Sequence, residues 1–142
     1  MSYFLNVDLD VEAEADPEPF LSALDERVLV LRRDPAPPHR VCLELSFDHR
    51  DVESTAADLC SVLELLPAAA RAWWDRASLR DFNVGIQAAA GPEAAEFLMG
   101  PPTLARMAAL GVRLVITVYA PDAPDAPDAP DGPGGAGRPV AP

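Results

Sequence analysis

Hydrophobic and polar residues alternate with a period of two over residues 111–119, where most side chains are β-branched or aromatic. One face of this predicted strand is apolar and the other is largely polar: Val112, Leu114, Ile116 and Val118 against Arg113, Thr117 and Tyr119. A strand with one apolar face needs a cover. The segment that precedes it, residues 103–110, is predicted to be the covering helix, and Gly111 would end that helix in a left-handed conformation.

The same alternation predicts four further strands. Residues 2–11 place five apolar side chains on one face and three polar ones on the other: Tyr3, Leu5, Val7, Leu9 and Val11 against Asn6, Asp8 and Asp10. Residues 27–33 and 39–47 are joined by a short proline-rich link, which favours an antiparallel hairpin. Residues 82–87 form another strand, with Phe82, Val84 and Ile86 turned inward.

Helix signals separate these strands. Asp16 precedes two prolines and predicts the start of a short helix, while Asp51 is expected to cap the principal helix. Apolar residues recur at steps of three and four in that helix and predict one buried stripe: Val52, Ala56, Leu59, Leu63 and Leu66. Pro67 would restart or kink the helix, which continues to about residue 77. Residues 93–99 fit either a short helix or a short edge strand.

The predicted order is βαββα(α)βαβ. This order indicates an α+β, two-layer fold: a mainly antiparallel five-stranded sheet with helices on one face, ferredoxin-like βαββαβ with an appended helix and strand. Residues 1–120 would form this single domain. Residues 121–142 are rich in Pro, Ala, Asp and Gly, bury almost nothing and are predicted to be a disordered tail.

The charge of the chain narrows the choice of partners. A net charge of −12 repels phosphate backbones and anionic headgroups, so we expect neither nucleic-acid nor membrane binding, and it would attract a basic protein. No signal-peptide pattern and no apolar run of membrane-spanning length is present, so the cytoplasm is the expected location. Cys42 and Cys60 are too few and too far apart for a disulfide framework or a zinc site.

Only one cluster suggests chemistry, the run from Asp48 through His49 and Arg50 to Asp51. Two carboxylates and an imidazole could bind a divalent ion or act in acid–base catalysis. The cluster lies where a strand passes into a helix, however, and Asp is preferred there as a cap. We therefore expect no catalytic residue, no metal and no cofactor. The alternative is a small-ligand sensor or small enzyme with a site near this junction, for which the first residues to test are Asp48, His49, Asp51 and Cys42.

The outward face of the sheet is the main candidate for a binding surface. It would display polar side chains from four strands, and no reactive group is gathered among them. Trp73 and Trp74 lie about 100° apart on their helix, so one is expected in the core and the other in part on the surface. The predicted partner-binding residues are Asp8, Asp10, Glu44, Asn83, Gln87, Arg113, Tyr119 and Trp74.

A family resemblance adds to this interpretation. It rests on the runs 72–74, 80–86, 103–111 and 114–119, which lie within a span of about a third of the chain and whose motifs are mostly fold-forming. These segments resemble a group of small bacterial proteins of unknown function, some of which look like immunity proteins of toxin systems. The resemblance implies no catalytic residues. Together with the acidic charge and the absence of a catalytic motif, it favours a non-catalytic binding protein, most concretely an immunity- or antitoxin-like inhibitor of a basic toxin. The sequence leaves open whether the protein is a monomer or a homodimer built through an exposed strand edge.

Overall fold

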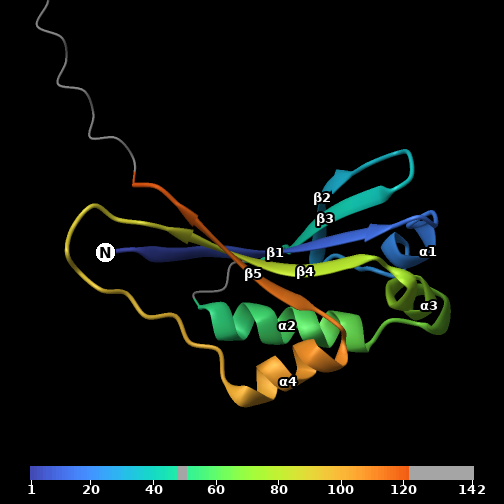
Figure 1. Cartoon of the computed structure of the whole chain (residues 1–142). Helices are drawn as coiled ribbons and strands as arrows, with labels where there is room; N and C mark the ends of the chain where they lie inside the picture. Colours follow the sequence, from blue (N-terminus) through green and yellow to red (C-terminus); the bar gives the residue numbers. More distant parts are fainter. Residues whose placement is uncertain (48–50, 122–142) are drawn as a thin grey trace, which may run out of the picture.

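A computed structural model describes residues 1–47 and 51–121 of the chain. Strands and helices follow one another in the predicted order (Figure 1). Their bounds are β1 (Tyr3–Ala13), α1 (Glu18–Leu21), β2 (Val28–Arg33), β3 (His39–Leu45), α2 (Val52–Glu64), α3 (Ala68–Arg76), β4 (Leu79–Gln87), α4 (Pro101–Ala109) and β5 (Arg113–Tyr119). Residues 93–99, predicted as helix or edge strand, form neither. The predicted tail lies outside the described residues, apart from Pro121.

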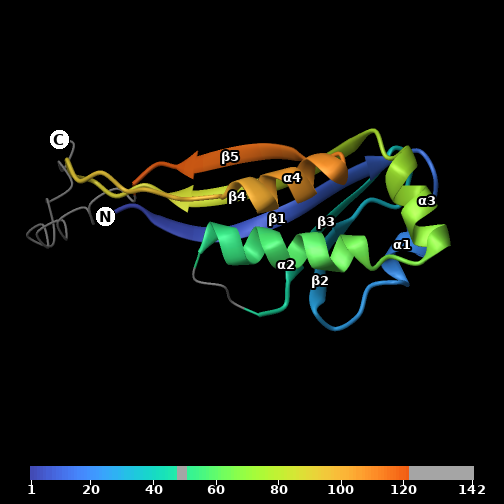
Figure 2. The same cartoon turned by 90° about the horizontal axis from the view of Figure 1, so that it is seen from below.

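The five strands form one open sheet in the order β2-β3-β1-β4-β5. Every neighbouring pair is antiparallel except β4 and β5, which are joined through α4 and run parallel. The first four strands therefore have the ferredoxin-like arrangement, and α4 with β5 is the appended unit. The predicted α+β class is confirmed, because α2, α3 and α4 lie on the same side of the sheet (Figures 1 and 2).

One hydrophobic core lies between the sheet and the helices. It contains the inward residues of the three central strands and the stripe of α2, including Val7, Leu9, Val41, Leu43, Phe82, Val84, Ala56, Leu59 and Leu63. The alternation in the sequence predicts this arrangement, because a period of two places every second side chain of a strand on the same face. Asp51 caps α2 as expected, with its carboxylate accepting the Ser54 N–H at 2.7 Å.

The N-terminal end of β1 departs from simple alternation. A β-bulge between Phe4 and Asn6 inserts Leu5 as an extra residue opposite β4. An extra residue shifts the alternation by one position, so Phe4 packs against the core while Tyr3 and Leu5 are exposed. The predicted inward placement of Tyr3 and Leu5 is therefore wrong.

The cover over β5 is incomplete. Gly111 ends the helical segment with φ of 71°, as predicted, and α4 packs mainly against α2. Leu114 is 45% exposed, and Ile116 and Val118 are each 61% exposed, although their side chains face the helix layer. The expectation that α4 buries the apolar face of this strand is corrected.

Candidate functional site: the open face of the sheet

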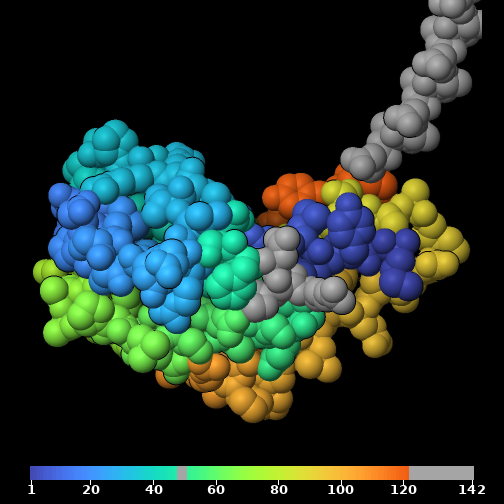
Figure 3. All heavy atoms as spheres, turned by 180° about the vertical axis from the view of Figure 1, so that it is seen from behind, coloured from blue at the N-terminus to red at the C-terminus, as the bar shows by residue number. Residues whose placement is uncertain are grey.

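The face of the sheet opposite the helices forms a trough among the described residues. No described helix crosses it, and the β2–β3 hairpin rises along one side (Figure 1). The molecular surface is hollowed between this hairpin and β5 (Figure 3). The central strand β1 forms the floor of the trough, so the side chains that β1 turns outward occupy its middle.

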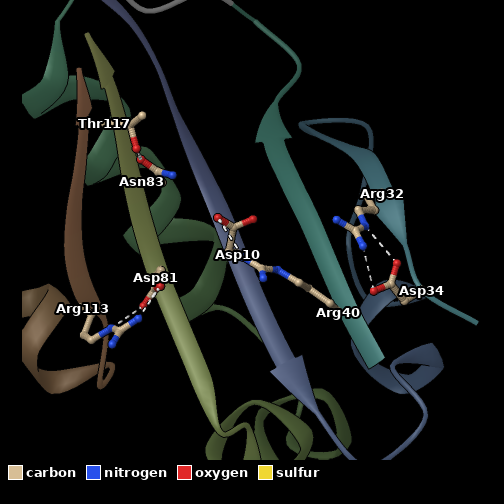
Figure 4. A network of polar contacts seen from close by, with 8 residues as sticks. All are labelled: Asp10, Arg32, Asp34, Arg40, Asp81, Asn83, Arg113 and Thr117. Carbon is tan, nitrogen blue, oxygen red and sulfur yellow. Dashed lines mark hydrogen bonds and ion pairs between the residues drawn. The ribbon is translucent and has the colours of Figure 1, made fainter. Parts of the chain in front are cut away.

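Three carboxylates form what we term the acidic floor: Asp8 and Asp10 on β1 and Glu44 on β3. Asp10 lies opposite Cys42 in the register of β1 and β3, which sets Asp8 opposite Glu44. Side chains at the edges of the floor bind two of these three carboxylates. The Arg40 guanidinium lies 3.9 Å from the Asp10 carboxylate, as Figure 4 shows, and the Asn6 amide donates to Glu44 at 2.5 Å.

Asp8 differs from its neighbours because it has no such partner. Within residues 1–47 and 51–121, no ion pair or hydrogen bond reaches its carboxylate. Burial, followed by the negative charges of Glu44 and Asp10, raises the pKa of Asp8 from 3.8 to about 6. A half-buried carboxylate without a cation costs folding free energy at neutral pH, and a cationic group of a partner would remove that cost.

This cost leads to a measurable prediction for Asp8→Asn. The folded state holds the Asp8 proton more tightly than the unfolded chain, so ionised Asp8 destabilises the fold fully above pH 6. The penalty shrinks as pH falls and disappears below the ordinary value near 3.8, where both states hold the proton. The variant should therefore be more stable than wild type by about 1 kcal/mol at pH 8, after allowance for solvent screening, and equal to it at pH 4. Urea unfolding at the two pH values measures this difference. Equal gains at both pH values would contradict the electrostatic cause.

The other predicted partner-binding residues of the sheet also lie on the open face, but several are engaged within the protein. Arg113 forms two hydrogen bonds of 2.8 Å with the buried Asp81, and Asn83 accepts the Thr117 hydroxyl at 2.7 Å (Figure 4). The Gln87 amide donates to the Ala120 carbonyl at 2.9 Å. These contacts join β5 to β4.

Tyr119 is not held in this way. Its side chain is 52% exposed at the rim of the trough, and its Cα pairs with that of Gln87. Such an aromatic group can contribute contact area to a partner at low cost in conformational entropy.

Trp74 is not part of any surface. Its side chain is fully buried, its Nε1–H donates to the Leu110 carbonyl at 3.0 Å, and the Arg80 guanidinium lies 5.9 Å from its ring centre. Trp73 is also buried, with its ring stacked on Phe20 at 4.8 Å. The predicted partner-binding role of Trp74 is therefore wrong. Two adjacent helix residues are both buried here because Phe20 of α1 stacks on both rings and the end of α4, at Leu110, packs against Trp74.

Some charged residues of the open face were not predicted from the sequence. Asp81 and Arg40 both belong to it, and both pair with charged residues of the predicted set. Asp81 was missed because the fourth strand was expected to begin at Phe82, whereas it begins at Leu79. Position 81 has the same parity as the polar Asn83 and Gln87, so the alternation, extended backward, could have located it.

The alternative site at the junction before α2 is only partly described. Asp48, His49 and Arg50 lie outside the described residues, and Asp51 serves as the helix cap. A groove of about 820 Å³ opens beside Asp51, between the start of β1 and residues 94–98. Across the described ranges, no group of three or more His, Cys, Asp and Glu side chains could hold a metal ion.

Neither thiol has the character of a nucleophile. Burial, together with a hydrogen bond to Asp10, raises the pKa of Cys42 to about 12, and burial raises that of Cys60 to about 11. Both thiols are therefore protonated at neutral pH, and the thiolate is the form that attacks or binds metal.

Comparison with known proteins found no match to a protein-family model, to a curated protein or to a solved structure. Among the residues that the structure describes, no helix has the length and apolar character needed to cross a bilayer. The function is therefore inferred from the geometry and charge of the open face.

Proposed function

We propose that this protein is a non-catalytic binding module whose trough accepts a basic surface of a protein partner. The observation that carries the proposal is the unpaired, half-buried carboxylate of Asp8 at the centre of the acidic floor. A Lys or Arg of the partner would form a charge-assisted hydrogen bond there and remove the repulsion among Asp8, Asp10 and Glu44.

An inhibitor of a toxin, of the immunity or antitoxin kind, is the most concrete form of this function. The net charge of −12 would draw a basic protein toward the trough and accelerate the encounter. Binding would then block the cationic cleft of the partner, such as a nuclease active site, by steric occlusion. The cytoplasm is the compartment in which we propose that this occurs.

Neutralisation of the acidic floor is the direct test. The partner to use first is the product of the adjacent gene, co-expressed with the full chain and then titrated by stopped-flow. We expect the triple variant Asp8→Asn, Asp10→Asn, Glu44→Gln to lower the association rate by at least about tenfold at low salt, since a charged cleft can raise on-rates by 10–10³. The rate for wild type should fall as salt increases.

A matched control separates the local effect from that of total charge. The variant Asp75→Asn, Glu93→Gln, Glu96→Gln removes three exposed carboxylates outside the trough and has the same net charge as the triple variant. It should keep the wild-type rate within about threefold. Equal losses in the two variants would contradict the proposed site. A rise in thermal stability with a metabolite or divalent ion, unchanged in the floor variant, would favour the small-ligand alternative instead.

A further inference from the structure

The C-terminal unit of the fold carries almost no charge. Between Phe97 and Tyr119 the only ionisable groups other than Tyr119 are Arg106 and Arg113, and these are bound by Glu64 and Asp81. Apart from Arg106, which is partly exposed, the exposed residues of α4 are all apolar: Pro101, Pro102, Leu104, Ala105, Ala108 and Ala109. A solvent-facing helix normally has a polar side, so this composition is typical of a helix that meets another surface.

Strand β5 continues this uncharged surface. The side chains of Leu114, Ile116 and Val118 are 45–61% exposed on the helix side of the sheet, and Leu98 beside them is 73% exposed. They are bare because α4 packs mainly against α2 and leaves the edge of the sheet open (Figure 2). A contiguous apolar surface of this kind marks an interaction site more often than a solvated face.

The backbone of the same three residues is also available. The Tyr119 carbonyl accepts the Ala88 N–H at 3.0 Å, so Tyr119 directs its backbone groups toward β4. Backbone direction alternates along a strand, and the groups of Leu114, Ile116 and Val118 therefore point away from β4, to the free edge. Within the part of the chain that the structure describes, each of these residues thus offers an apolar side chain and an N–H and C=O that no neighbouring strand binds.

The two edge strands of the sheet differ in how well they are protected from pairing with another chain. At the opposite edge, β2 carries Arg32 and Arg33, and a bulge interrupts its register between Val30 and Arg32. Charges and bulges are the devices by which edge strands avoid pairing with other chains. From Leu114 to Tyr119, β5 has neither a charge nor a break in its pairing.

We propose that β5 is the interface of a homodimer, in which two copies of β5 pair antiparallel about a two-fold axis at Ile116. Ile116 then pairs with its own counterpart, and Leu114 pairs with Val118 of the partner subunit. Antiparallel pairing also sets the α4 of the partner beside the bare C-terminal half of β5, which covers the side chains that this chain's own α4 leaves exposed.

The charge distribution favours a second copy of this chain as the partner that binds the surface of α4 and β5. Two molecules that each carry −12 repel one another over most of their surfaces, and the uncharged surface of α4 and β5 is where they can meet with the least repulsion. A basic partner would gain no electrostatic attraction there. The interface is also self-complementary about one residue, as a two-fold contact requires. It uses the free edge and the helix side of β5 rather than the open face, and it does not depend on the function proposed for the trough.

Opposite charges at Ile116 test the two-fold arrangement. We expect the wild-type full chain to sediment as a dimer, and Ile116→Glu and Ile116→Lys each to weaken dimerisation on the order of 100-fold, because like charges would face each other at the axis. An equimolar mixture of the two variants should recover the dimer. Ile116 is 61% exposed, so both variants should fold, which circular dichroism verifies.

Val30→Glu is the matched control, because Val30 is 49% exposed on the other edge strand. It should leave the dimer intact, as should the floor variant. In Ile116→Cys, oxidation should give a covalent dimer, since residues in a hydrogen-bonded antiparallel pair have Cα atoms at roughly 5.5 Å, within disulfide reach. A monomeric wild type, loss of the dimer in Val30→Glu rather than Ile116→Glu, or failure of the mixture to associate would each overturn the proposal.

Discussion

Replacement of Trp74 by alanine is expected to remove about 3–5 kcal/mol from the free energy of unfolding. A domain of this size is stable by only about 5–15 kcal/mol, so much of the variant should be unfolded at physiological temperature. The loss has three sources: the cavity left by a fully buried indole, the loss of the Leu110 hydrogen bond, and the loss of packing against Phe20. Urea denaturation followed by circular dichroism measures it.

Two comparison variants identify the cause of the stability loss in Trp74→Ala. Trp74→Phe keeps most of the ring contacts but leaves the Leu110 carbonyl without its donor, so its loss should be intermediate. Leu65→Ala truncates a side chain that is 71% exposed and should change stability by less than about 0.5 kcal/mol. A Trp74→Ala variant as stable as Leu65→Ala would show that the indole is not a core residue.

The buried face of each strand was predictable because each strand encodes its faces locally. Val7, Leu9 and Val11 alternate with Asp8 and Asp10, and this period of two fixes which side of β1 meets the helices. The prediction failed at Leu5, where the bulge shifts the alternation. A bulge is a feature of the pairing between two strands, so the residues of one strand alone do not reveal it.

The appended unit, α4 with β5, shows a different limit of prediction from sequence. The alternation of β5 is as regular as that of β1, and it correctly separates Ile116 from Thr117 by face. The pattern does not show how far α4 covers the apolar face of β5. The position of α4 depends on its contacts with α2, which join residues far apart in the sequence, and those contacts draw it away from β5.

The composition of the acidic floor was predictable from alternation, and its charge balance was not. Asp8, Asp10 and Glu44 share a face because each has the right parity in its strand. Only the register between strands shows that Arg40 approaches Asp10 and that Asp8 has no cation among the described residues. The distinction matters for function, since the unpaired carboxylate is the group that a basic partner would engage.

The two proposals fit together in space. Pairing of β5 with its counterpart would extend the sheet across the axis, and the axis would stand perpendicular to the sheet. Both troughs would then open on the same side, and both helix layers would lie on the other. A dimer built in this way could bind two basic segments of one partner, which raises apparent affinity without new contacts.

Glu53 is the side chain that fixes α4, and with it β5, to the rest of the fold. It projects from the first turn of α2, and its carboxylate accepts the Gly100 N–H at 2.9 Å and the Thr103 hydroxyl at 2.6 Å. α4 has no side-chain cap of its own at Gly100. The carboxylate therefore serves as the cap from a neighbouring helix, and it also lies near the positive ends of both helices.

We expect Glu53→Ala to lower the free energy of unfolding by about 2 kcal/mol, because it removes two charge-assisted hydrogen bonds in a partly buried position. Amide hydrogen exchange should accelerate most in residues 101–119, since α4 loses its start. Glu64→Ala removes the other carboxylate by which α2 holds α4, at Arg106, but that pair is more exposed and its loss should cost less than about 1 kcal/mol. Uniform acceleration throughout the sheet, or a larger cost for Glu64→Ala, would contradict the role of Glu53. If dimerisation uses β5, Glu53→Ala should weaken it as well, because the strand and the helix that form the interface would no longer be held in place.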